Sequence, residues 1–142
     1  MQISAKTNYA IRALLFVAAN DPVPVKVGAL AREGLPPRFV ENILGELRRG
    51  ELVHSRRGRA GGFTLARPAS EITLGQIVRV VSGPVSDVHG LAEDCPPADP
   101  AAHLPAVWQA IMERLAKLLD ELTLADILEG QVPRVGERAL AR

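Results

Sequence analysis

The sequence predicts a mainly α-helical protein with a small β-hairpin wing, in which a winged helix-turn-helix is followed by a long C-terminal dimerisation helix. Three observations lead to this fold class. Apolar residues recur at helical spacing in three segments before residue 50, two short extended segments with a glycine-rich link follow, and a heptad pattern marks a segment near the C-terminus. Helix, turn, helix and then a hairpin is the order of a winged helix-turn-helix.

Length and composition are those of a single globular domain. The chain has 142 residues, of which 47% are apolar and 23% are charged. These values allow a modest core and exclude wholesale disorder. No charge-free run reaches the roughly 20 apolar residues that span a bilayer, and the N-terminus lacks an export signal. We therefore expect no membrane association and a cytoplasmic location.

Three helices are predicted in the N-terminal half. The first covers about residues 4–20, and the second covers 27–32 and ends at Gly34, a residue type suited to a helix C-terminus or a tight turn. Pro36 and Pro37 suit the first turn of the third helix, which extends to about Arg49. On this third helix we expect a buried stripe of Phe39, Val40, Ile43, Leu44 and Leu47, opposite a polar and basic face of Arg38, Glu41, Asn42, Gly45, Arg48 and Arg49.

The hairpin is predicted from two extended segments, residues 52–56 and 63–66. The link between them, residues 57–62, contains three glycines, which permit positive φ. Its tip is cationic, since Arg56, Arg57 and Arg59 lie together there. A further helix over 74–81 is expected, capped by Ser70 or Thr73.

The C-terminal part combines an acidic, proline-rich loop with a long helix over about 105–122. The helix places five large apolar residues at alternating steps of three and four, namely Trp108, Ile111, Leu115, Leu118 and Leu122. This seam favours contact with a second copy of the chain, and packing on the chain's own domain is the alternative. Thr123 with Asp126 predicts a capping box for a final short helix closed by Gly130. We divide the chain into a winged helix-turn-helix unit at 1–82, an acidic, proline-rich loop at 83–104, dimerisation helices at 105–130 and a flexible tail at 131–142.

Charge is distributed unevenly. Residues 1–67 hold eleven Lys and Arg against five Asp and Glu, a net +6, whereas residues 68–142 carry a net −5. A basic half favours a polyanionic partner such as double-stranded DNA, although a charge cluster can also be only a solvated face. Near the N-terminus of the third helix, Arg38, Glu41 and Asn42 are suited to base edges, whereas Arg48 and Arg49 are suited to phosphates or to the helix dipole. The wing arginines are suited to phosphates or a minor groove.

The sequence gives little support for an enzyme active site. The single cysteine, Cys95, forbids an intramolecular disulfide and a cysteine-rich metal cage within one chain. As a nucleophile with His89 or His103 as base it is disfavoured, because Glu93 and Asp94 oppose thiolate formation. The glycines of the wing lack the spacing and the lysine of a nucleotide-binding loop. We expect His54 to be packed or to face phosphate rather than to bind a metal.

Six segments together resemble a known family. They read ISAKTNYAIRAL at 3–14, FVENIL at 39–44, LRRGELV at 47–53, SRRGRAGGFTLARP at 55–68, ITLGQI at 72–77 and TLADI at 123–127. As a set they are similar to the Rrf-two family of bacterial winged helix-turn-helix regulators, the group that includes IscR, NsrR and CymR. The resemblance covers most of the chain.

This resemblance implies a homodimeric transcription factor, usually a repressor, that binds a palindromic operator and whose long C-terminal helix crosses to the partner subunit. Carried over by position, Glu41 and Asn42 in the third helix and Arg57 in the wing fall where family members contact DNA. The resemblance adds Lys6 and Tyr9 in the first helix as DNA contacts.

The sequence departs from the family at the sensor. Cluster-binding members carry three cysteines in the loop before the tryptophan-bearing helix, whereas this loop holds only Cys95, with His103 nearby. Since a two-iron cluster takes four ligands, we expect no iron-sulfur cluster and no metal site. Alternatives are a cluster shared across a dimer, a thiol-based redox sensor using Cys95, a small-molecule or anionic effector, and a winged-helix module that binds a protein partner.

Overall fold

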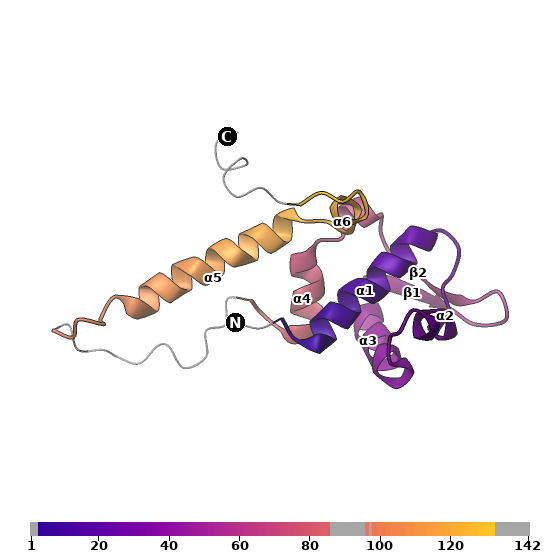
Figure 1. The fold of residues 1–142 in the computed structure, drawn as a ribbon, viewed down its shortest axis with the longest axis horizontal. Helices are drawn as coiled ribbons and strands as arrows, with labels where there is room; N and C mark the ends of the chain where they lie inside the picture. Colours follow the sequence, from indigo (N-terminus) through magenta and orange to yellow (C-terminus); the bar gives the residue numbers. More distant parts are fainter. Residues whose placement is uncertain (1–2, 86–95, 97, 133–142) are drawn as a thin grey trace.

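A computed structural model of the chain describes residues 3–85, 96 and 98–132. Figure 1 shows a cluster of helices and a hairpin from which one long helix extends. The elements are α1 (Ala5–Asn20), α2 (Val27–Arg32), α3 (Pro37–Arg49), β1 (Val53–Arg56), β2 (Gly62–Leu65), the 3₁₀ turn η1 (Ala69–Glu71), α4 (Leu74–Ser82), α5 (Leu104–Glu121) and α6 (Leu124–Leu128). The mainly α fold with a two-stranded hairpin that the sequence predicts is therefore confirmed.

The first helix begins where a serine can cap it. Ser4 Oγ accepts a hydrogen bond from Thr7 N at 3.1 Å, which satisfies one of the first amides of α1. The buried side of α1 carries small residues, Ala10 and Ala13, beside Leu14 and Val17. Thr7 is buried with them, and its hydroxyl lies 2.7 Å from Ser82 Oγ at the end of α4. Small residues and this hydroxyl contact let α4 pack closely on α1.

A single apolar core joins the N-terminal helices to the end of the described chain. Leu14 of α1, Leu30 of α2, Leu44 of α3 and Ile77 of α4 have no exposed surface, and neither does Leu124 of α6. Burying a leucine or isoleucine side chain stabilises a fold by about 1.5–3 kcal/mol relative to leaving it exposed. The short α6 is therefore part of the helix-turn-helix unit, although it lies more than 70 residues from α3 along the chain.

The third helix confirms the predicted stripe with one correction. Val40, Ile43, Leu44 and Leu47 are buried, but Phe39 is 39% exposed. The four buried residues form the middle of the helix face that packs on the core. Position 39 lies at the edge of this face. Phe39 instead packs edge-on against Tyr9 of α1, with ring centroids 5.7 Å apart.

The hairpin is anchored by a third backbone segment. β1 pairs antiparallel with β2, and Arg56 lies opposite Gly62. Val25, before α2, exchanges two backbone hydrogen bonds with Phe63 at 2.8 and 2.9 Å. Gly62 has φ of 146°, and a Cβ there would come within 2.7 Å of the Val25 carbonyl oxygen. Glycine is therefore needed at this crossing, and β2 begins at residue 62, one residue before the predicted start.

Two capping boxes mark the starts of α4 and α6. Thr73 caps α4 together with Gln76, so the other candidate cap, Ser70, is wrong and lies in η1. Thr123 and Asp126 form the predicted box at α6. Thr73 and Thr123 also lie opposite each other in an isolated bridge, which brings the start of α4 next to the end of α5.

The long helix α5 begins at Leu104, one residue before its predicted start, and contains no fully buried residue. Its main contact is with α4. In Figure 1 its N-terminal end and the tip of the hairpin lie at opposite ends of the molecule. None of the helices in the described part of the chain is long and apolar enough to cross a bilayer.

Candidate nucleic-acid interface

The outward face of α3 is polar and has few internal contacts. Arg38, Glu41 and Asn42, near its N-terminus, are exposed, and no hydrogen bond or ion pair engages these side chains within the described residues. Arg48 and Arg49 are exposed in its last turn. An α-helix fits the major groove of B-form DNA, and the residues near the N-terminus of a recognition helix reach the base edges. The exposed face of α3 therefore has the residue types and the helix end that base readout requires.

The N-terminal turns of α1 lie along one flank of α3. Lys6 Nζ lies 2.8 Å from Glu46 Oε2 of α3, and the two side chains are 34% and 28% exposed. Tyr9 lies further along the same flank, against Phe39. The two residues that the family resemblance adds to the site are thus brought to α3. The ammonium of Lys6 is already paired.

Glu46 is a site residue that sequence reasoning did not identify. It lies one helical turn after Asn42, and it faces α1 because the core stripe rotates that flank toward Lys6. Its carboxylate neutralises a cation that would otherwise face the interface. No motif in the sequence distinguishes Glu46, since its partner lies 40 positions earlier in another helix.

The wing presents its arginines on a glycine-shaped turn. Arg56, Arg57 and Arg59 are all exposed. Gly58 has φ of 99°, and a Cβ at Gly61 would collide with the carbonyl oxygen of Arg56. The glycines therefore have structural roles in the turn, while the guanidinium groups beside them remain accessible to a phosphate backbone.

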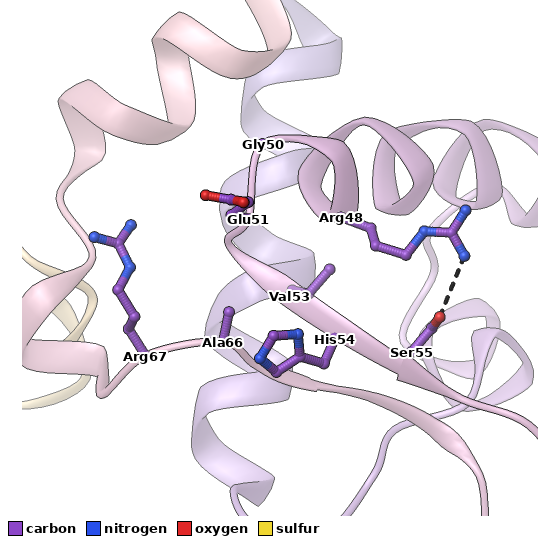
Figure 2. Close-up of a pocket in the computed structure, with 8 residues that line it drawn as sticks. All are labelled: Arg48, Gly50, Glu51, Val53, His54, Ser55, Ala66 and Arg67. Atoms are coloured by element: carbon purple, nitrogen blue, oxygen red, sulfur yellow. Dashed lines mark hydrogen bonds between the residues drawn. The ribbon is translucent and has the colours of Figure 1, made fainter.

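A hollow lies between the end of α3 and the base of the wing (Figure 2). Its lining consists of Arg48, Gly50, Glu51, Val53, His54, Ser55, Ala66 and Arg67. Arg48 Nη1 donates to Ser55 Oγ at 3.2 Å, and this bond ties α3 to β1. His54 is exposed on β1, so of its two expected environments the packed one is wrong. Two arginines, Arg48 and Arg67, and one carboxylate, Glu51, therefore line the surface between α3 and the wing.

A family model named Rrf2, described as an iron-dependent transcriptional regulator, matches residues 3–130. A Mycobacterium tuberculosis protein named as an HTH-type transcriptional regulator, Rv1287, is 40% identical over 136 residues, which are 94% of this chain and 84% of that protein. IscR of Klebsiella pneumoniae is 30% identical over 134 residues, covering 92% of this chain and 82% of IscR.

Solved structures give the same picture. CymR, the global cysteine regulator of B. subtilis, superposes with a TM-score of 0.77 at 30% identity, covering 92% of this chain and 98% of CymR. IscR of T. potens superposes with a TM-score of 0.73 at 28% identity, covering 94% and 93%. These likenesses extend through the helix-turn-helix, the wing and the long helix.

The described residues include two of the chain's three histidines and not its cysteine. His103 lies just before α5 and is exposed, whereas His54 lies on the wing. Cys95 lies outside the described residues, and the chain contains no other cysteine. Within residues 3–85 and 98–132, no three His, Cys, Asp or Glu side chains gather as ligands. Such a cluster takes four thiolate or imidazole ligands.

Replacing Glu46 with Gln is expected to raise the affinity for any duplex severalfold at low salt. The substitution releases the Lys6 ammonium and removes a negative charge beside α3. The slope of log affinity against log salt should become steeper by up to about 0.9, the value of one added phosphate contact. Fluorescence anisotropy with random-sequence duplex measures both quantities. Glu71→Gln, which removes a carboxylate from η1, is the matched control, and equal gains in both variants would contradict a specific role for Glu46.

Proposed function

The chain belongs to the Rrf2 family of transcriptional regulators, and we propose that it is a homodimeric repressor that binds a palindromic operator. The family and the relatives it matches are regulators of transcription, not enzymes. One observation carries the proposal. The side chains of Arg38, Glu41 and Asn42 project from α3 without a hydrogen bond or ion pair in the described part of the molecule.

These three side chains have different affinities for base edges. Arginine forms two hydrogen bonds with guanine, asparagine forms two with adenine, and glutamate accepts from the amino group of cytosine. Arg56, Arg57 and Arg59 of the wing supply phosphate contacts, which add affinity without sequence information. α3 therefore supplies the preference for particular base sequences, and the wing supplies affinity for any DNA duplex.

The apolar face of α5 supports the homodimer. Trp108 is 40% exposed and Ile111 and Leu118 are each 42% exposed, whereas Leu115 and Leu122 are partly buried. A helix with this much exposed apolar surface is stabilised by a partner. A second copy related by a two-fold axis supplies the same face in return. Such a dimer presents two copies of α3 related by the same two-fold axis, and this symmetry favours a palindromic operator.

We propose that the regulator acts without an iron-sulfur cluster, because the chain carries one cysteine where cluster-binding members of the family carry three. Its signal is then a small-molecule effector or the oxidation of Cys95. A cytoplasmic location is part of this proposal, because the target is duplex DNA.

Asn42→Ala and Arg57→Ala should separate base readout from phosphate binding. Asn42→Ala should cost about 1–3 kcal/mol of discrimination between the operator and its single-base variants, with a modest loss of random-duplex affinity. Arg57→Ala should weaken binding to every duplex and lower the salt slope by about 0.9. The operator is first selected from a random duplex library with the parent protein. Variants that bind operator and random duplex as the parent does would contradict this assignment.

Ile111→Glu should dissociate the homodimer. An unpaired carboxylate buried in the apolar seam costs about 3 kcal/mol or more, equivalent to a dissociation constant raised more than about a hundredfold. Sedimentation equilibrium measures this change. Lys117→Glu introduces the same side chain on α5 outside the seam and should leave the dimer intact. A parent protein that sediments as a monomer would exclude the proposed dimer.

Protein purified without oxygen should be colourless and free of iron. The expected visible absorption spectrum lacks charge-transfer bands, since a single cysteine does not reproduce the three thiolates of the cluster-binding members. A brown, iron-containing protein would overturn the cluster-free proposal and identify Cys95 and histidines as ligands.

A further inference from the structure

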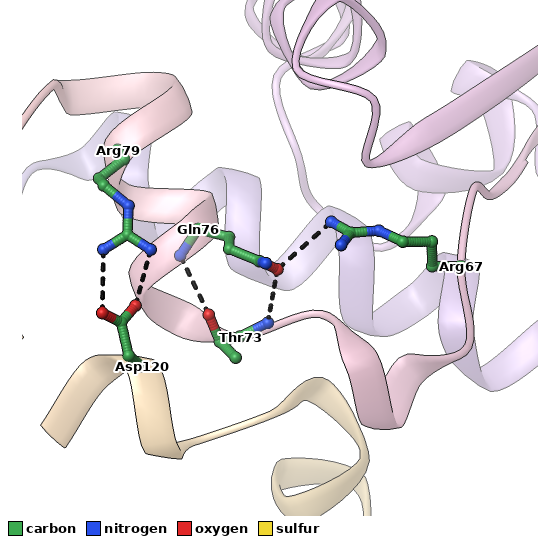
Figure 3. A network of polar contacts seen from close by, with 5 residues as sticks. All are labelled: Arg67, Thr73, Gln76, Arg79 and Asp120. Carbon is green, nitrogen blue, oxygen red and sulfur yellow. Dashed lines mark hydrogen bonds and ion pairs between the residues drawn. The ribbon is translucent and has the colours of Figure 1, made fainter. Parts of the chain in front are cut away.

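A two-armed ion pair joins α5 to α4 (Figure 3). Arg79 Nη2 donates to Asp120 Oδ1 at 2.7 Å, and Arg79 Nη1 donates to Asp120 Oδ2 at 3.2 Å. Two parallel hydrogen bonds between planar groups restrict direction as well as distance. Among the described residues, this is the only ion pair between these two helices.

Asp120 and Gly75 do not stabilise the helices in which they lie. Asp120 lies in the last turn of α5, where a carboxylate is disfavoured by the negative end of the helix dipole, and Glu121 beside it is disfavoured in the same way. Gly75 lies within α4, where glycine is a poorer helix former than alanine. The contact between α4 and α5 accounts for an aspartate at position 120 and a glycine at position 75.

Gly75 makes room for the carboxylate. Gly75 and Arg79 are four residues apart and therefore lie on the same face of α4. A Cβ at position 75 would collide with Asp120 Oδ1 and would approach Arg79 Nη1 to 3.2 Å. Gly75, Arg79 and Asp120 thus form a fitted seat, in which the glycine provides the space and the arginine provides the partner.

The seat adds a second attachment point to the junction between α4 and α5. At the first, Leu74 N donates to Leu122 O at 2.8 Å and Leu124 N donates to Ile72 O at 3.0 Å. These backbone bonds hold α5 at Leu122 and leave its direction to side-chain contacts. The second attachment point, at Asp120, restrains its direction.

The same end of α4 is tied to the base of the wing. Gln76 Oε1 accepts from Thr73 N at 3.1 Å within the capping box and from Arg67 Nη2 at 3.4 Å (Figure 3). Arg67 follows β2 and lines the hollow beside α3. Hydrogen bonds therefore connect α4 both to the DNA-facing surface and to the long helix.

We propose that Gly75, Arg79 and Asp120 act as a positioning seat that sets the angle of α5 against the DNA-binding unit, and thereby the half-site spacing that the homodimer accepts. This inference rests on the proposed function, a dimer formed through α5 on a palindrome. An 18-residue helix is about 27 Å long, so a tilt of ~10° at one end moves the other by roughly 5 Å. A displacement of that size exceeds the rise of one base pair.

The seat suits a geometric role better than a stabilising one. Its two side chains are 42% and 45% exposed, and ion pairs this exposed contribute little to folding stability. Variants of the seat should therefore fold and melt like the parent, while the angle of α5 becomes less restricted.

The test measures binding to operator duplexes whose half-site separation is changed by one or two base pairs, and to a single half-site. The parent should prefer one separation by about tenfold or more. Asp120→Ala should reduce that preference at least about fivefold, and its affinity for the single half-site should be unchanged. Gly75→Ala should do the same, because its methyl group displaces the carboxylate. Thermal unfolding confirms that each variant is folded.

Two comparisons make the test specific. Gly75→Ala should have no further effect on spacing preference in the Asp120→Ala background, since the carboxylate it displaces is already gone. Glu121→Gln removes the neighbouring carboxylate, for which the described residues supply no hydrogen bond or ion pair, and should bind as the parent does.

Unchanged spacing preference in both single variants would overturn the inference, and so would an equal loss of affinity for the single half-site. A parent protein that selects no duplex at all would instead overturn the proposed function, and the inference with it.

Discussion

The burial of one face of α3 is the constraint on which the rest of the site depends. Val40, Ile43, Leu44 and Leu47 are at most 1% exposed, so the helix has one favourable rotation against α1 and β1. That rotation directs Arg38, Glu41 and Asn42 outward and turns Glu46 toward Lys6. The ion pair on one flank and the bond from Arg48 to Ser55 at the end of the helix are consequences of this packing. Each is too exposed to determine it.

Stability and orientation have separate origins in this molecule. The apolar core, which extends from Ala10 to Leu124, supplies most of the favourable free energy of folding. The ion pair of Arg79 with Asp120 is directional and half exposed, and it adds to the packing of α5 on α4. Its proposed role is therefore in the orientation of the long helix and not in the stability of the unit that carries α3.

Members of one family share a fold more reliably than they share the residues of a ligand site. The matching model is described as iron-dependent and spans residues 3–130, yet the chain contains one cysteine. The packing of helices and wing requires only apolar residues and glycines at the right positions, whereas a cluster requires particular donor atoms. The match therefore shows the fold of this chain and not its sensor chemistry.

The sequence by itself determined the helices, the hairpin and the cationic wing, because periodicity, prolines, glycines and caps act over a few neighbouring residues. It also identified Arg38, Glu41 and Asn42 as exposed, since they lie opposite a continuous apolar stripe. Tertiary structure alone decided the exposure of Phe39, the pairing of Lys6 with Glu46 and the seat of Asp120 over Gly75. These depend on contacts between residues that lie 30 to 45 positions apart in the chain, and the edge of a stripe is buried only if the neighbouring helix covers it.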